Sequence, residues 1–264
     1  MRKIIIFCMI LFVFIVGCEK STSPGIASKI NGTVHDPSGN PVADAKILVN
    51  FNIDCDYPIK SKNGLFELQN KNICSDPDAV DDPPWFETKL YNNYPNPFTN
   101  VTSINFCLGT TCSISVWIED NFDNEVKTIL ANQSCQAGHS QVVWNGKNND
   151  NKNFQNGTSK VMLYAKDELF CDTLFVFKDY NDFTYNTTTP LRTTNNAGQF
   201  TIYSQDLPLN YVGDYFDPEG CNPGDFSVTP YIDIWAFHAD YASVHIDSVL
   251  IESGHDINVT LTFE

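Results

Sequence analysis

Apolar and polar residues alternate through most of the chain beyond its first 27 residues. The pattern is clearest in AKILVNFNI (45–53), SISVWIED (113–120) and DINVTLTFE (256–264), where every second residue is apolar. A period of two is typical of β-strands with one buried face, whereas an amphipathic helix shows a period of 3.6. Turn-forming residues separate such runs, in DPSGNP (36–41), NNDNKN (148–153), NNAGQ (195–199) and DPEGCNPGD (217–225). The pattern therefore predicts an all-β protein built from β-sandwiches.

The first 18 residues, MRKIIIFCMILFVFIVGC, break this pattern with a basic start followed by an apolar run over residues 4–17. The run is shorter than the roughly 20 residues that a membrane-spanning helix needs. A short apolar run behind basic residues is typical of a secretory signal peptide. Its end, Ile15-Val16-Gly17-Cys18, resembles the bacterial lipobox, which implies cleavage after residue 17 and a lipid on Cys18. An ordinary signal with a chance cysteine, or an uncleaved anchor, is the alternative.

The leader and the charge together predict a location. Buried methylenes contribute about 0.8 kcal/mol each, so several acyl chains on Cys18 would hold a soluble domain on a membrane. The formal net charge is −16 and becomes −18 without the leader, which carries Arg2 and Lys3 but no acidic residue. Such a charge argues against nucleic-acid binding and against lying flat on anionic lipid. We expect a lipid-anchored protein of the cell envelope, in the outer rather than the inner membrane.

Nine cysteines fall to seven in the mature chain, because Cys8 is cleaved away and Cys18 carries the lipid. The seven are Cys55, Cys74, Cys107, Cys112, Cys135, Cys171 and Cys221. Outside the cytoplasm such residues favour disulfides, although an odd number leaves at least one thiol over within a chain. The sequence does not give the pairing. A zinc site is disfavoured, since the chain has no C-x₂-C pair to begin one.

Residues 28–53 carry a spaced set of turn and strand residues: Ile30, Gly32, Val34, Asp36, Gly39, Pro41 and Ala45. This stretch resembles the start of a carboxypeptidase regulatory-like domain, which is a small transthyretin-like β-sandwich. The matching later strands lie far downstream, in 193–210 with Gly198 and Phe200, and in the segment that runs to residue 264. A weaker copy around Gly64 and Phe66 (61–70) leaves a separate N-terminal domain open.

The stretch from residue 90 to about 165 contains Tyr94-Pro95-Asn96-Pro97-Phe98, Ala137-Gly138-His139 and Trp144-Asn145-Gly146. It resembles the FlgD-type immunoglobulin-like domain, a pattern that also occurs in sorting domains of type IX secretion cargo. Proline fixes φ and removes a donor, so the first of these motifs should deliver Phe98 to the edge of a core. Trp144, on an alternating strand before a turn, is interpreted as a core anchor rather than a sugar-stacking residue.

The two resemblances together predict one sandwich nested in a loop of another, both immunoglobulin-like or transthyretin-like. The predicted segments are a lipoprotein signal peptide (1–17), the lipidated cysteine with its tether (18–27), a discontinuous outer sandwich (28–60 and 184–264), an acidic, proline-bearing linker (61–89) and the inserted FlgD-like domain (90–183). Insertions of this kind succeed where the two ends of a loop lie close together at the surface.

No catalytic motif is present: there is no H-E-x-x-H, G-x-S-x-G, G-x-x-x-x-G-K or G-x-G-x-x-G. His238, His245 and His255 each have a nearby aspartate and form the best metal candidate, but solvated polar positions are the preferred reading. The linker aspartates lack the glycine and glutamate of a calcium loop; they are Asp76, Asp78, Asp81 and Asp82. We therefore predict no catalytic residue, no metal and no cofactor.

The leading functional hypothesis is a non-catalytic envelope lipoprotein whose β-sandwiches serve a structural, adhesive or ligand-binding role, with a protein or a glycan as ligand. An alternative is a carbohydrate-binding or enzyme-associated module that grips sugar through exposed aromatics such as Trp85, Trp235 and Tyr211. A second alternative is a component or cargo of type IX secretion. Exposed aromatic rings in a planar row would favour the carbohydrate hypothesis.

Overall fold

The computed structural model describes residues 28–55, 87–216 and 223–264, and it confirms the all-β prediction. The strands are β1 (Lys29–His35), β2 (Lys46–Cys55), β3 (Lys89–Leu90), β4 (Thr102–Leu108), β5 (Cys112–Glu119), β6 (Glu125–Cys135), β7 (Gly138–Trp144), β8 (Gly157–Ala165), β9 (Glu168–Val176), β10 (Arg192–Thr193), β11 (Gln199–Tyr203), β12 (Val212–Phe216), β13 (Pro223–Phe237), β14 (Val244–Leu250) and β15 (Ile257–Thr262). Three single 3₁₀ turns accompany them: η2 (Tyr180–Asp182), η3 (Tyr185–Thr187) and η4 (Ser204–Asp206). None of the described segments is a helix of the length and apolar character needed to cross a membrane.

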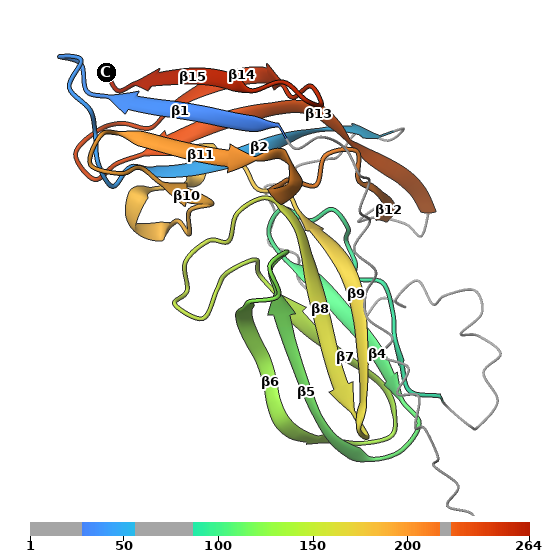
Figure 1. Cartoon of the computed structure of the whole chain (residues 1–264). Helices are drawn as coiled ribbons and strands as arrows, with labels where there is room; N and C mark the ends of the chain where they lie inside the picture. Colours follow the sequence, from blue (N-terminus) through green and yellow to red (C-terminus); the bar gives the residue numbers. More distant parts are fainter. Residues whose placement is uncertain (1–27, 56–86, 217–222) are drawn as a thin grey trace, which may run out of the picture.

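The first sandwich, which we call the host, joins the two ends of the described chain (Figure 1). One sheet has the order β11-β1-β15, and the other has the order β10-β2-β13-β12 with β14 also paired to β13. Strand β1 runs antiparallel to β11 and parallel to β15, with Ile30 opposite Ile257 and Val34 opposite Leu261. The alternation predicted for residues 256–264 is observed, because Leu261 and Phe263 are buried while their neighbours are exposed.

Two glycines are required where β1 and the start of β11, in one host sheet, approach closely. Gly32 lies opposite Phe200 in the β1–β11 register, and a Cβ at Gly32 would come within 1.9 Å of the Phe200 ring. Gly198 has a φ of +68°, and its Cβ would lie 2.5 Å from the Val34 carbonyl oxygen. A side chain at either position would therefore clash, and at Gly198 it would also strain the backbone.

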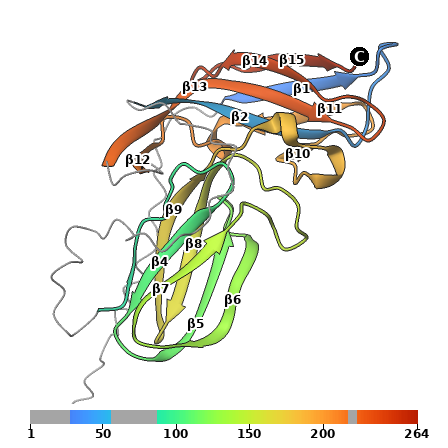
Figure 2. The same ribbon diagram turned by 180° about the vertical axis from the view of Figure 1, so that it is seen from behind.

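The second sandwich, which we call the inserted sandwich, lies between β2 and β10 in chain order (Figures 1 and 2). Its sheets have the orders β3-β4-β7 and β6-β5-β8-β9. Its core is built around Trp144, which is 1% exposed and contacts Phe98 and Phe154. The indole Nε1 of Trp144 donates to the Lys147 carbonyl oxygen over 2.9 Å, as a buried indole N–H requires. Trp144 is therefore a core residue, as interpreted from the sequence.

The Tyr94-to-Phe98 segment fastens the inserted sandwich to its own last strand. The Tyr94–Pro95 and Asn96–Pro97 peptide bonds are both cis. The Phe98 amide donates to the Phe175 carbonyl oxygen over 3.1 Å, and the Phe177 amide donates to the Phe98 carbonyl oxygen over 2.9 Å. Phe98 itself is buried in the core, which is the place that the sequence predicts for it.

Candidate functional site

The three aromatic residues predicted to face solvent do not form an exposed row among the residues that the structure describes. Trp85 lies outside the described residues. Trp235 is only 7% exposed, because the His245 ring stacks on it at a centroid distance of 4.1 Å and Phe237 stacks at 6.0 Å. Tyr211 is half-buried and packs against Phe226. The expectation that Trp235 is an exposed sugar platform is therefore wrong: its ring faces are covered by neighbouring side chains.

The three candidate metal-binding histidines each have a separate carboxylate neighbour. His238 Nδ1 lies 3.8 Å from Asp240, and His245 Nε2 lies 3.3 Å from Asp247. His255 lies 3.9 Å from Glu252, not beside Asp256 as its place in the sequence suggested. Across the described ranges, no group of three or more histidine, cysteine or acidic side chains is arranged to hold a metal ion. Cys18 and the four linker aspartates lie outside those ranges.

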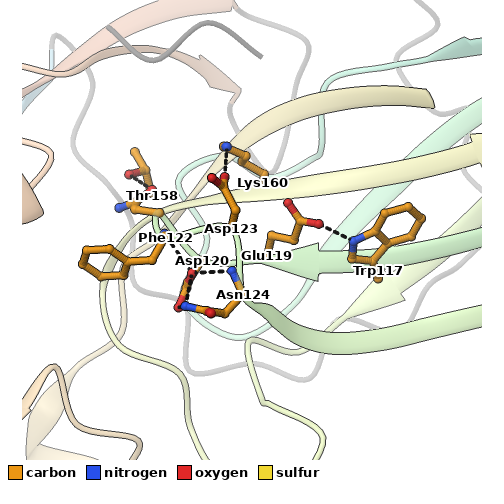
Figure 3. A network of polar contacts seen from close by, with 9 residues as sticks. Trp117, Glu119, Asp120, Phe122, Asp123, Asn124, Thr158 and Lys160 are labelled. Atoms are coloured by element: carbon orange, nitrogen blue, oxygen red, sulfur yellow. Dashed lines mark hydrogen bonds and ion pairs between the residues drawn. The ribbon is translucent and has the colours of Figure 1, made fainter. Parts of the chain in front are cut away.

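Several acidic side chains surround the turn between β5 and β6 (Figure 3). Asp120 accepts hydrogen bonds from the amides of Phe122 and Asn124, over 2.8 and 2.9 Å. Asp123 pairs with Lys160 over 2.6 Å. These are the contacts of a tight turn closed by an aspartate side chain and tied to the neighbouring strand.

Two further side-chain hydrogen bonds hold the strand before the turn and the turn itself. Trp117 Nε1 donates to Glu119 over 2.7 Å, and the Thr158 hydroxyl donates to Asn121 over 2.9 Å. Because the carboxylates of Glu119, Asp120 and Asp123 already accept hydrogen bonds from the protein, the cluster is organised as a structural turn. We do not assign it a ligand.

Buried aromatic and polar side chains join the two sandwiches at a junction. Phe175, near the end of β9, is fully buried and belongs to the core of the host rather than to that of its own sandwich. Its ring contacts Phe51, Tyr211 and Phe226 at centroid distances of 6.1, 6.1 and 5.3 Å. Its neighbours in sequence, Leu174 and Val176, belong to the core of the inserted sandwich. One short stretch of β9 therefore contributes to both cores.

Asn156 is the polar centre of this junction, and it is 4% exposed. Its side-chain amide donates to the Asn50 side chain over 2.9 Å and to the Lys178 carbonyl oxygen over 2.8 Å. Its side-chain oxygen accepts from the Lys178 amide over 2.7 Å. A buried amide is stable only when its donors and acceptor are satisfied, and these three bonds satisfy those of Asn156.

Tyr180 completes the junction from the segment that leads back to the host. Its hydroxyl donates to the Val49 carbonyl oxygen over 2.9 Å and accepts from the Asn156 amide over 2.9 Å. Burial raises the pKa of this hydroxyl well above its usual range, partly offset by the hydrogen bond from Asn156. The ring packs edge-on to Trp235, so residues 180–183 cover the outer face of the host sheet.

Lys178 carries a buried amine beside the junction. Its Nζ donates to the Asn145 carbonyl oxygen over 2.8 Å. Burial, with a smaller contribution from repulsion by Lys147, lowers the pKa of Lys178 to about 8. Its aliphatic stem packs on Gly146, where a Cβ would lie 2.5 Å from the lysine Cε.

The sequence indicates this junction through a run of consecutive apolar residues near the end of β9, which a search for alternating residues misses. In LFVF (174–177) both alternate faces are apolar. A strand that is apolar on both faces is buried on both sides, so such a strand at the end of an inserted domain indicates contact with a second core. The polar partners Asn156 and Tyr180 carry no such signal, since single Asn and Tyr residues are common in turns and cores alike.

Known proteins show only weak similarity to this chain. No protein-family model matches the chain. No curated protein matches it either. Among solved structures, PorZ, a bacterial surface component of the type-IX secretion system of Porphyromonas gingivalis, is 20% identical over 33% of this chain with a TM-score of 0.25. The match spans only 11% of PorZ. The major pilin subunit BcpA of Bacillus cereus, as its D312A variant, is 9% identical over 90% of this chain and 99% of the pilin, with a TM-score of 0.16.

Proposed function

We propose that this protein is a non-enzymatic, lipid-anchored protein of the cell envelope. In this proposal, the two sandwiches act as one rigid body that presents a binding surface away from the membrane. The leader and Cys18 supply the anchor. We assign the host to the carboxypeptidase regulatory-like sandwiches and the insert to the FlgD-type domains, and both assignments belong to the proposal.

The observation that carries the rigid role is the shared junction. Phe175 of the insert occupies the host core, and Asn156 and Tyr180 bond to Asn50 and the Val49 carbonyl oxygen of β2. Inter-domain contacts that are polar and shallow permit relative motion, whereas a buried aromatic with satisfied hydrogen bonds opposes it. A fixed two-domain rod is suited to display, spacing or adhesion.

A protein is favoured over a glycan as the ligand. Of the three aromatic residues proposed for sugar stacking, Trp235 is covered by the His245 ring, and Tyr211 is half-buried against Phe226. Sugar recognition through stacking needs an accessible aromatic face. A glycan array probed with the mature chain tests this choice, and a reproducible hit would reverse it.

The anchor is tested by comparing Cys18→Ala with Cys8→Ala in a bacterial host that processes lipoproteins. We expect wild-type protein and Cys8→Ala to incorporate radiolabelled palmitate and to sediment with membranes. Cys18→Ala should lose the label, because the thiol that accepts the lipid is gone, and retain its leader. Cys8→Ala is the matched control, since it removes a cysteine from the same leader. Unlabelled wild-type protein would refute the lipid anchor.

A further inference from the structure

Two cysteines face each other across the β5–β6 hairpin. Cys112 is the first residue of β5 and Cys135 is the last residue of β6, and the antiparallel register places them directly opposite. Opposed residues of an antiparallel pair have Cα atoms about 4.5–5.5 Å apart. Disulfides span Cα separations of about 4.4–6.8 Å, so the backbone needs no rearrangement to join this pair.

The side chains of the pair also share one face. Both thiols are half-buried and pack against the core of the inserted sandwich. Burial raises the pKa of the Cys135 thiol, and the nearby Cys112 thiol raises it further. Both are free thiols in this structure. The sulfur atoms therefore point into the same space, from the same side of the sheet.

A crosslink between Cys112 and Cys135 would stabilise an irregular edge strand. β6 is an edge strand, and its pairing with β5 shifts register at three places. The last part of β6 is exposed, at Ala131, Asn132, Gln133 and Ser134. The polar turn around Asp120 closes one end of the hairpin, and a covalent bond between Cys112 and Cys135 would close the other. An irregular edge strand fixed at both ends resists slippage and pairing with other chains.

We propose that Cys112 and Cys135 form a disulfide in the mature protein. One thiolate attacks the sulfur–sulfur bond of an oxidised low-molecular-weight disulfide such as oxidised glutathione, forming a mixed disulfide and releasing one glutathione thiolate. The second cysteine thiolate then displaces the second glutathione. The two cysteines lose two protons and two electrons, and glutathione disulfide is reduced. The presence of an oxidising environment rests on the proposed function. The choice of Cys112 and Cys135 as partners rests on the β5–β6 register.

Peptide mapping tests the pairing directly on the full chain, purified in detergent without reductant and equilibrated with oxidised glutathione. Free thiols are alkylated, and the chain is then cut with chymotrypsin. Cleavage after Leu108, Trp117, Leu130 and Trp144 gives the peptides 109–117 and 131–144, each with a single cysteine. We expect the two peptides joined as one species that separates on reduction. Alkylated peptides, or links from either peptide to a different cysteine, would overturn the proposal.

A stability measurement separates a crosslink from mere packing. Reductant should lower the midpoint unfolding temperature of the wild type by roughly 5–10 °C more than that of a Cys112→Ser/Cys135→Ser variant. The matched control is Ser113→Ala/Ser134→Ala, the next opposed pair, which should keep the sensitivity of the wild type. An equal response of wild type and cysteine variant would contradict the proposal. Neither experiment depends on Cys18, so a failed lipid anchor and a failed disulfide give different results.

Discussion

At the residue scale, Phe175 is the side chain on which the joining of the two sandwiches most depends. It is fully buried, its ring contacts three aromatic residues of the host, and it is carried by a strand of the insert. Its backbone is held on both sides, since Asn96 accepts from its amide and Phe98 donates to its carbonyl oxygen. The Tyr94-to-Phe98 segment, which was predicted to deliver Phe98 to the edge of a core, therefore also positions Phe175.

Truncation of this residue should be severe. Phe175→Ala removes a buried ring and leaves a cavity, so we expect the free energy of unfolding to fall by about 3–5 kcal/mol. Leu169→Ala is the matched control, because Leu169 lies on the same strand and is 48% exposed. Leu169→Ala should change the free energy of unfolding by no more than about 0.5 kcal/mol. Urea denaturation followed by circular dichroism measures both, and similar losses in the two variants would contradict the role of Phe175.

Lys178 gives the protein a pH dependence of definite sign. Its pKa is about 8 in the folded state and near 10.5 in the unfolded chain. Between these values the unfolded chain holds a proton that the folded protein has lost, so stability rises with pH. We expect a gain of about 2 kcal/mol from pH 8 to pH 10. Above pH 10 the raised pKa of Tyr180 acts in the opposite direction, because unfolding then releases its proton.

Replacement of the amine tests this assignment. Lys178→Met keeps most of the aliphatic stem but cannot titrate, so its stability should change less with pH over the same interval. Chemical denaturation at pH 7, 8, 9 and 10 provides the comparison. If the variant and the wild type gain stability in parallel, another group is responsible.

At the element scale, β15 completes the sheet and the core of the host sandwich. It is the last of the described strands, it pairs in parallel with β1, and its inward residues complete the core. Parallel neighbours depend on distant segments, so this pairing forms only when both ends of the described chain meet.

Two adjacent substitutions in β15 separate the effect of its two faces. Leu261→Asp places a carboxylate at a position that is 1% exposed, so we expect a loss of more than about 4 kcal/mol and little soluble protein. Thr262→Asp, one residue further on, faces solvent and should change stability by less than about 1 kcal/mol. Soluble yield and thermal melting measure the difference. Equal effects would mean that the register of β15 is different.

At the scale of the whole molecule, the junction should make the two sandwiches unfold together. Phe175 belongs to one core while Leu174 and Val176 belong to the other, so neither core opens without disturbing the same strand. We expect one calorimetric transition with equal calorimetric and van't Hoff enthalpies. Two resolved transitions in the wild type would show that the sandwiches are energetically independent.

The hydroxyl of Tyr180 provides a variant for this test. Tyr180→Phe leaves the Asn156 amide and the Val49 carbonyl oxygen without their buried partner, which should cost about 1–3 kcal/mol and broaden the transition. Tyr185→Phe is the control, because Tyr185 meets Lys46 and His238 through its ring. The control should melt as the wild type does.

The all-β fold, and the strands at 45–53, 113–120 and 256–264 with their inward faces, followed from the sequence. These features are local: a side chain's period along a strand fixes which face is buried, and glycine or proline fixes where the chain turns. The predicted leader and the predicted anchor at Cys18 are local in the same sense, and both stay predictions. The nested order was predicted because resembling segments lie at both ends of the chain.

Tertiary structure alone decided the junction, the covering of Trp235 and the meeting of Cys112 with Cys135. Trp235 sits in a strand whose pattern does not distinguish a solvent-facing ring from a covered one. His245 of β14 stacks on its ring, and Tyr180 of η2, over 50 residues away in sequence, packs edge-on to it. The cysteine pair depends on a register with three shifts, which no count along the chain reveals. In the predicted strands, the sequence determined which face of the sheet each side chain points to, because a strand's own backbone alternates between the two faces. The partner that each side chain meets was decided by packing between distant segments, because burial and hydrogen bonding are properties of two surfaces rather than one.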